Sequence, residues 1–297
     1  RLLKAPAGVI LKEKYVCREE KDMNYYETEK VNDNLTMIRS LTGELLYLVE
    51  GEADAILIDT CLGVGYLKAL VSSLTDKNLK VLLTHGHVDH AMGAPEFEGV
   101  YMNPRDIPIY RSHCPLEMRR DYIRSNIGEK AEQELVNSYV QSEPDYLFQD
   151  LVDGMIFDLG GIHIEVYSYP GHTPGSMVFL IREMRILILG DACNTFTFLF
   201  DENSSPVDEY MRTTERMRDR LKGKYDRVFL SHREMETGKD IMDDIIEVCR
   251  EILDGKTDDI PFDFMGTKAY IAKLCDEQVK RVDGKCGNIV YNKERLY

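Results

Sequence analysis

The hydrophobic and polar positions of the first half of the chain predict alternating strands and helices. Apolar runs at 44–50, 54–60 and 79–85 are bounded by polar turns and have the length of strands, whereas 65–75 has helical spacing. Residues 105–150 break this rhythm with helix-like sequence rich in Arg, Glu and Tyr. We therefore expect a β-β-α-β unit followed by a helical insert near 105–150, outside the sheet.

The second half repeats this layout. Its apolar runs predict strands at 162–169, 177–181, 184–190 and 227–231 and helices near 207–221 and 240–254. Two similar halves predict an α/β fold in which two mixed β-sheets pack face to face with helices outside, a four-layer αββα sandwich. We expect one domain over 1–297, with residues 257–297 as a C-terminal extension that wraps back on the body.

Composition and charge narrow the class of protein. The 297 residues are 43% hydrophobic and 30% charged, which is ordinary for a globular enzyme with a substantial core. The formal net charge of -15 works against binding to a phosphate backbone, so we expect no nucleic-acid partner. No apolar run reaches the ~20 residues of a membrane span, so we expect no membrane insertion either.

The cysteines bear on the compartment. There are seven, an odd number, scattered and without a CxxC pair, which is typical of reduced thiols and predicts a cytoplasmic protein. The sequence begins at Arg1 without a Met and leaves open whether an N-terminal segment was removed. It also leaves self-association into a homo-oligomer open.

The densest group of chemical side chains follows the apolar run at 79–85. Four residues that can bind metal, His85, His87, Asp89 and His90, occur within six positions in HGHVDH. On an extended chain His85 and His87 project to the same side, and a turn beyond them re-aims the other two. One strand end can therefore supply ligands to two metal ions.

Three further candidates stand where predicted strands end. His172 lies in PGHTPGS, Asp191 in LGDA and His232 in LSHR, each after an apolar segment. Residues at strand ends are held by a rigid sheet but face a cleft, which suits metal ligands.

Together, HGHVDH, PGHTPGS, GDA and the strand-terminal SH resemble the ordered motifs of the metallo-β-lactamase-fold hydrolases, over about 43–250. The resemblance implies that fold, with His85, His87 and His172 on a first metal. It also implies that Asp89, His90 and His232 bind a second metal and that Asp191 bridges the pair.

Two positions narrow the resemblance. The enzymes that destroy β-lactam antibiotics carry Cys or Ser in place of Asp191, and the flavodiiron oxidases carry Glu in place of His87. The set is similar to the glyoxalase II and lactonase side of the superfamily, which implies cleavage of a small ester, thioester, lactone or amide. Alternatives are a mononuclear iron dioxygenase that oxidises sulfur compounds, a phosphodiesterase, or a binding protein that keeps the fold without catalysis.

The ligand set favours two divalent ions, with zinc preferred and iron or manganese open, because nitrogen and oxygen ligands accept all three. Such a pair lowers the pKa of a bridging water toward ~7 and so supplies hydroxide as the nucleophile. We expect Asp89 to be the catalytic proton carrier.

Other polar residues have simpler interpretations. His113 and His163 are expected to be hydrogen-bonded core or surface residues, whereas Asp59 either caps a turn or orients a ligand histidine.

The aromatic run 193–200 follows Asp191 directly. It is expected either to line an apolar pocket for the substrate or to pack as core beneath the insert. If it lines a pocket, Tyr110, Met118 and Tyr122 of the insert are candidates for the facing wall.

Overall fold

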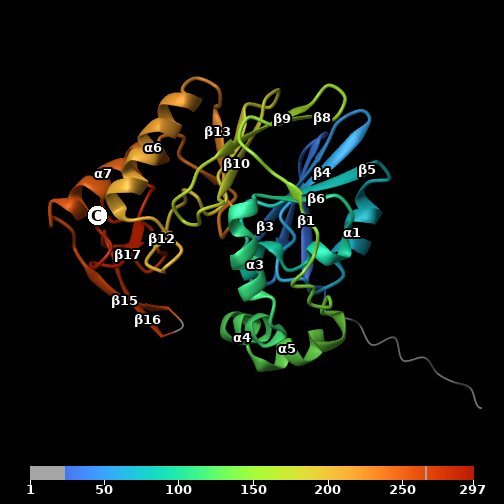
Figure 1. The fold of residues 1–297 in the computed structure, drawn as a ribbon, viewed down its shortest axis with the longest axis horizontal. Coiled ribbons are helices and arrows are strands. Elements are labelled where there is room, and N and C mark those ends of the chain that lie inside the picture. Colours follow the sequence, from blue (N-terminus) through green and yellow to red (C-terminus); the bar gives the residue numbers. More distant parts are fainter. Residues whose placement is uncertain (1–23, 265) are drawn as a thin grey trace, which may run out of the picture.

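The computed structural model describes residues 24–264 and 266–297, whose strands form three sheets (Figure 1). The first has seven strands, in spatial order β1 (Tyr26–Asn32), β2 (Leu35–Ser40), β3 (Leu45–Glu50), β4 (Asp54–Ile58), β5 (Asn78–Leu82), β6 (Val100–Met102) and β7 (Gln149–Asp150). Strands β1 to β4 are antiparallel and β4 to β7 are parallel, so this sheet is mixed.

The second sheet has six strands and is also mixed. Its order is β14 (Glu236–Thr237), β13 (Arg227–Phe229), β11 (Ile186–Ile188), β10 (Met177–Ile181), β9 (His163–Ser168) and β8 (Ile156–Asp158). Strands β11 and β13 are parallel, and the other neighbours are antiparallel.

A smaller third sheet is built largely from the end of the chain. It contains β12 (Thr197–Leu199), β17 (Ile289–Tyr291), β16 (Thr267–Ile271) and β15 (Ile260–Phe264). The sequence pattern did not predict this sheet. It pairs β12 of the aromatic run with β17, so the C-terminal extension is joined to the body by a strand ladder.

Helices cover the outer faces of the two large sheets. They are α1 (Leu67–Leu74), α2 (Val88–Ala91), α3 (Ile107–His113), α4 (Leu116–Ile127), α5 (Glu129–Leu135), α6 (Val207–Leu221) and α7 (Ile241–Leu253). Short 3-10 turns occur at Ala94–Glu96, Pro104–Asp106 and Val136–Ser138. Figure 1 shows α6 and α7 on the outside of the second sheet and α1 on the opposite side of the molecule, beyond the first sheet.

A shared apolar core holds the two large sheets together. Side chains from both inner faces meet in one buried cluster, in which the rings of Tyr47 and Phe229 lie 5.6 Å apart. Separate clusters fill the space between each sheet and its helices. The predicted α/β sandwich of two mixed sheets with helices outside is therefore confirmed.

The central strands are apolar along their length because both of their faces are covered. Every residue of β10 is buried, and so are four of the five residues of β4. Strand β1 shows the opposite pattern, with charged and exposed residues on an edge. The hairpin of β1 and β2 was not predicted, because its edge strand lacks an apolar run.

The described residues contain no helix that is long and apolar enough to cross a membrane. The six cysteines that lie among them are free, and four of these are buried.

Candidate metal centre

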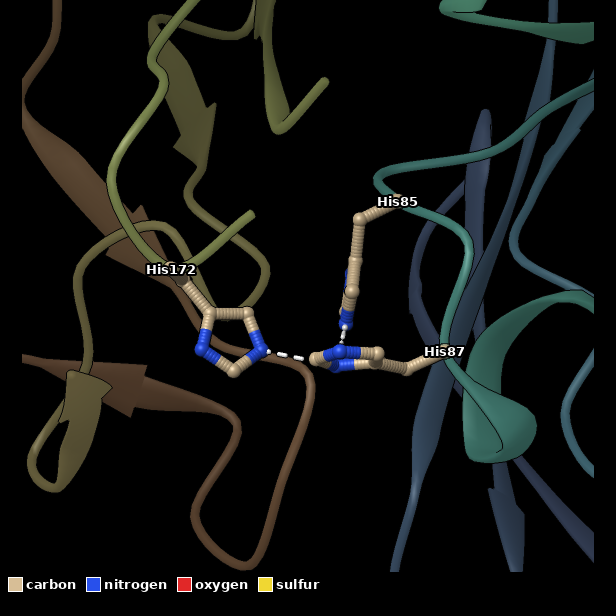
Figure 2. Close-up of side chains that lie close together, drawn as sticks. All are labelled: His85, His87 and His172. Atoms are coloured by element: carbon tan, nitrogen blue, oxygen red, sulfur yellow. Dashed lines mark hydrogen bonds between the residues drawn. The ribbon is translucent and has the colours of Figure 1, made fainter. Parts of the chain in front are cut away.

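The imidazoles of His85, His87 and His172 converge from two separate loops (Figure 2). The first two follow β5, and His172 lies between β9 and β10. Nε2 of His85 is 3.1 Å from Nδ1 of His87, and Nε2 of His172 is 3.0 Å from that same Nδ1. Three imidazole nitrogens so close together can bind one divalent cation.

A second group forms beside the first. Asp89 and His90 belong to the short helix α2, and His232 follows β13. The Nε2 atoms of His90 and His232 are 3.1 Å apart, and Oδ2 of Asp89 is 3.5 Å from Nε2 of His232. These three side chains can bind a further cation.

Asp191 lies between the two groups. Its Oδ2 is 3.3 Å from Nε2 of His232, 3.7 Å from Nε2 of His90 and 3.9 Å from Nε2 of His172. The fold thus brings together all the residues that the sequence motifs selected, although they come from four separate segments of the chain.

In His172 and His90, a hydrogen bond at Nδ1 determines which ring nitrogen carries the proton and which carries the lone pair. Nδ1 of His172 is 2.9 Å from the carbonyl oxygen of Phe198, which can only accept, so Nδ1 carries the proton. Nδ1 of His90 is 2.9 Å from Oδ2 of Asp59 and donates in the same way. In the neutral form of both rings Nε2 therefore carries the lone pair that a metal ion requires.

The same reasoning applies to His85. The hydroxyl of Thr84 donates to Asp59, with Oγ1 2.8 Å from Oδ2, and can therefore only accept from Nδ1 of His85 at 3.0 Å. Asp59 thus orients His90 directly and His85 through Thr84, and of its two interpretations the orienting one is confirmed. The donor set of imidazole lone pairs and carboxylates fits a divalent cation.

The electrostatics of the two groups differ. Burial, with the neighbouring imidazoles, lowers the pKa of His85 and His87, so these rings are neutral. Burial opposes charge on His232 as well, but the carboxylates of Asp191 and Asp89 raise its pKa to about 9. Although burial alone would raise the pKa of Asp191, the imidazoles of His232 and His90 hold it well below its usual value. Asp191 therefore offers an ionised carboxylate to a cation.

A buried carboxylate that sequence reasoning missed ties the two histidine loops together. Asp106 is fully buried, and its Oδ2 accepts from the Gly86 amide at 2.9 Å and from the Thr173 hydroxyl at 2.7 Å. Its Oδ1 accepts from the Gly175 amide at 2.6 Å. A Cβ on Gly175 would lie only 2.5 Å from Oδ1, so this close approach requires glycine.

The two remaining described histidines do not join the cluster. His163 is 2.8 Å from Glu183 at the surface, as expected of a hydrogen-bonded surface residue. Nδ1 of His113 accepts from the Val88 amide at 3.0 Å, and its ring stacks on His87 with centroids 5.1 Å apart. His113 therefore supports the loop that carries His87 and also lines the cavity beside it.

A cavity of about 730 Å³ opens onto the cluster and includes His87, Asp89, His172, Asp191 and His232 in its lining. Phe196, Phe198 and Phe200 form part of its wall, as one interpretation of the aromatic run predicted. Met118 and Tyr122 of the insert line it as well, but Tyr110 does not. Tyr110 is buried and donates to the carbonyl oxygen of Glu143, so its assignment to the wall was wrong.

The third sheet supplies the remaining wall. Phe262 and Ile271 line the cavity, and the rings of Phe198 and Phe262 lie 5.8 Å apart. The aromatic run packs against this sheet. The pocket could not be completed from the sequence, because nothing in 257–297 signals that it returns to the metal centre.

Histidines and aspartates that could hold metal ions thus lie at strand ends in a fold of two packed mixed sheets with helices outside, the αββα class. The sequence profile of the metallo-beta-lactamase superfamily matches residues 42–232, and the chain belongs to this superfamily.

Similar proteins include a fungal enzyme and a bacterial protein. An atrochrysone carboxyl ACP thioesterase of Claviceps purpurea is 25% identical over 184 residues, which cover 60% of this chain and 47% of that protein. An uncharacterised protein of Mycobacterium tuberculosis is 31% identical over 131 residues, 44% of this chain and 56% of its own. The chain thus spans about half the length of these relatives.

Solved structures support the fold. A metallo-beta-lactamase from Pontibacter korlensis aligns with a TM-score of 0.55 at 16% identity, covering 76% of this chain and 99% of that one.

We predict that Asp106→Asn loosens both histidine loops, because an amide nitrogen then faces groups that themselves donate hydrogen bonds. The free energy of unfolding should fall by about 1–3 kcal/mol in urea titrations, and the affinity for added metal should fall with it. Asp76→Asn, at an exposed position, is the matched control and should change neither quantity. Wild-type stability and affinity in Asp106→Asn would show that this carboxylate does not hold the loops.

Proposed function

We propose that this protein is a metal-dependent hydrolase that cleaves a small ester, thioester, lactone or amide. The observation that carries the proposal is the convergence of five histidines and two aspartates at the floor of a partly apolar cavity. Membership of the superfamily and the similarity to the thioesterase of Claviceps purpurea support the same reaction class.

We assign His85, His87 and His172 to one divalent ion and Asp89, His90 and His232 to a second, with Asp191 shared. The distances between donor atoms and the tautomers that Asp59, Thr84 and Phe198 impose support this assignment. Imidazole and carboxylate ligands without a thiolate suit zinc and also accept iron or manganese.

Bound divalent ions would supply hydroxide at neutral pH and polarise the scissile carbonyl. The protein's own part is to hold the substrate and to move a proton. The carboxylate of Asp89 lines the cavity beside His232, where it can take the proton of the attacking water and deliver it to the leaving group. Water then adds to the acyl carbon, the bond to oxygen, sulfur or nitrogen breaks, and the leaving group departs protonated.

One ligand position argues against β-lactams as substrates, and a second argues against the flavodiiron oxidases. Asp191 stands where the resemblance implies Cys or Ser in the antibiotic-destroying enzymes, and His87 stands where the flavodiiron oxidases have Glu. We therefore place the protein nearest the glyoxalase II and lactonase side of the superfamily. Cytoplasmic location and self-association stay predictions.

The cavity favours a substrate with an apolar acyl or aromatic group. Phe196, Phe198 and Phe262 form one wall, and Met118 of α4 contributes to the lining as well. Burying such a group against these rings would contribute binding energy in proportion to its apolar area.

The test is elemental analysis of the purified protein together with a panel of lactone, thioester, ester and phosphodiester substrates. We expect about two zinc ions per chain and oxygen-independent turnover of a lactone, ester or thioester. His87→Ala should lose turnover while circular dichroism shows an unchanged fold. One iron with oxygen consumption, phosphodiester cleavage alone, or near-normal activity in His87→Ala would overturn the proposal.

Phe198→Ala tests the acyl pocket. The backbone carbonyl that holds His172 is retained, whereas the apolar wall loses a ring, so kcat/KM for an octanoyl thioester should fall about 10–100-fold. The acetyl thioester of the same thiol should change less than 3-fold by this reasoning, since it does not reach the ring. Leu147→Ala, at a side chain that is 90% exposed, should affect neither substrate. Equal losses for both thioesters would argue against an acyl pocket at this wall.

A further inference from the structure

Tyr122 connects the helical insert to the second group of metal-binding residues. It lies in α4, is partly buried and lines the cavity. Its hydroxyl oxygen is 3.1 Å from Oδ2 of Asp89 and 3.0 Å from Oε1 of Glu44. Oδ2 of Asp89 is also the atom that lies 3.5 Å from Nε2 of His232. The tyrosine therefore contacts the same oxygen of Asp89 that faces His232.

Glu44 is buried, and its Oε1 accepts the hydrogen bond from Tyr122. Only 2% of its surface is exposed, and its Oε2 accepts from the hydroxyls of Ser40 and Thr42 and from the thiol of Cys61 at 3.4 Å. These three donors fix the orientation of the carboxylate, because each hydrogen bond that Oε2 accepts restricts the rotation of the side chain.

The backbone fixes Glu44 beside the centre. Glu44 forms an isolated β-bridge with His232, and the amide of Leu45 donates to the carbonyl oxygen of Ser231 at 2.8 Å. The carboxylate is thus anchored from behind, and Tyr122 is positioned between it and Asp89.

The hydroxyl of Tyr122 separates two carboxylates that would otherwise repel each other. The hydroxyl of Tyr122 carries a single proton, which can bond either Glu44 or Asp89. Removing the hydroxyl would leave Asp89 without this partner and facing Glu44 directly. The orientation of Asp89 toward His90 and His232 then loses its support from the insert.

We propose that Tyr122 and Glu44 are positioning residues that hold the Asp89 carboxylate for the second metal ion. This inference rests on the proposed function, because it assumes that Asp89 binds an ion. Partners that orient a metal ligand typically contribute 10–100-fold to metal affinity. The helical insert thereby becomes part of the metal centre as well as a wall of the pocket.

The experiment compares stepwise zinc binding in the chelator-stripped wild type, Tyr122→Phe and Tyr146→Phe, using competition with a chromophoric chelator. Tyr146 is the matched control. Its hydroxyl also donates to a residue outside the insert, the carbonyl oxygen of Phe97 at 2.6 Å, but this contact lies away from the cavity. Tyr122→Phe should weaken the second binding constant about 10–100-fold and leave the first within about 2-fold. Tyr146→Phe should leave both constants unchanged.

Activity provides a second readout. At limiting zinc, kcat of Tyr122→Phe should fall while KM stays near the wild-type value, since the ring is retained, and excess zinc should restore most of kcat. Glu44→Gln should give the same pattern. It provides an independent test in case Tyr122→Phe does not fold. Because both residues act through one hydroxyl, the double variant should lose no more than the larger single effect.

The outcomes separate the two proposals. A wild type that binds two zinc ions, with both constants unchanged in Tyr122→Phe, removes this inference and leaves the proposed function intact. Additive losses in the double variant also contradict it. A wild type that binds fewer than two ions removes the two-ion function, and this inference with it.

Discussion

The proposed metal centre requires imidazole nitrogens to lie against one another and carboxylates to lie close together. Nδ1 of His87 lies 3.1 Å from Nε2 of His85 and 3.0 Å from Nε2 of His172, and carboxylates crowd the neighbouring group. Such an arrangement is unfavourable in isolation, so it persists only where surrounding structure fixes each side chain. Two sheets that share one apolar core provide the rigid frame, and their strand ends deliver the side chains to a common edge.

Hydrogen bonds from residues around the cluster fix the orientation of its histidines and aspartates. Asp59 orients two imidazoles, and Asp106 joins the loops that carry the three histidines of the first group. Tyr122 and Glu44 do the same for Asp89 from the insert. The insert and the third sheet also line the cavity, so segments outside the two large sheets shape the pocket.

The sequence predicted the frame and the cluster but not their supports. The helix expected at 207–221 has those bounds, and the apolar strands were located within a few residues, because strands covered on both faces are continuously hydrophobic. The cluster was recognisable because HGHVDH is so dense in ligands. Asp106 and Glu44 could not be recognised from the sequence. Each is an isolated acidic residue, and its hydrogen-bond partners are hydroxyls and backbone amides that leave no local sequence pattern. The domain limits, which rested on the insert and tail boundaries, stay predictions.

The most direct test of the central claim is the anomalous scattering of a crystal of the zinc-loaded protein, recorded on both sides of the zinc absorption edge. The proposed centre predicts two peaks, one among His85, His87 and His172 and the other among Asp89, His90 and His232, with Asp191 in contact with both. A single peak, or zinc bound elsewhere with these side chains turned apart, would contradict it.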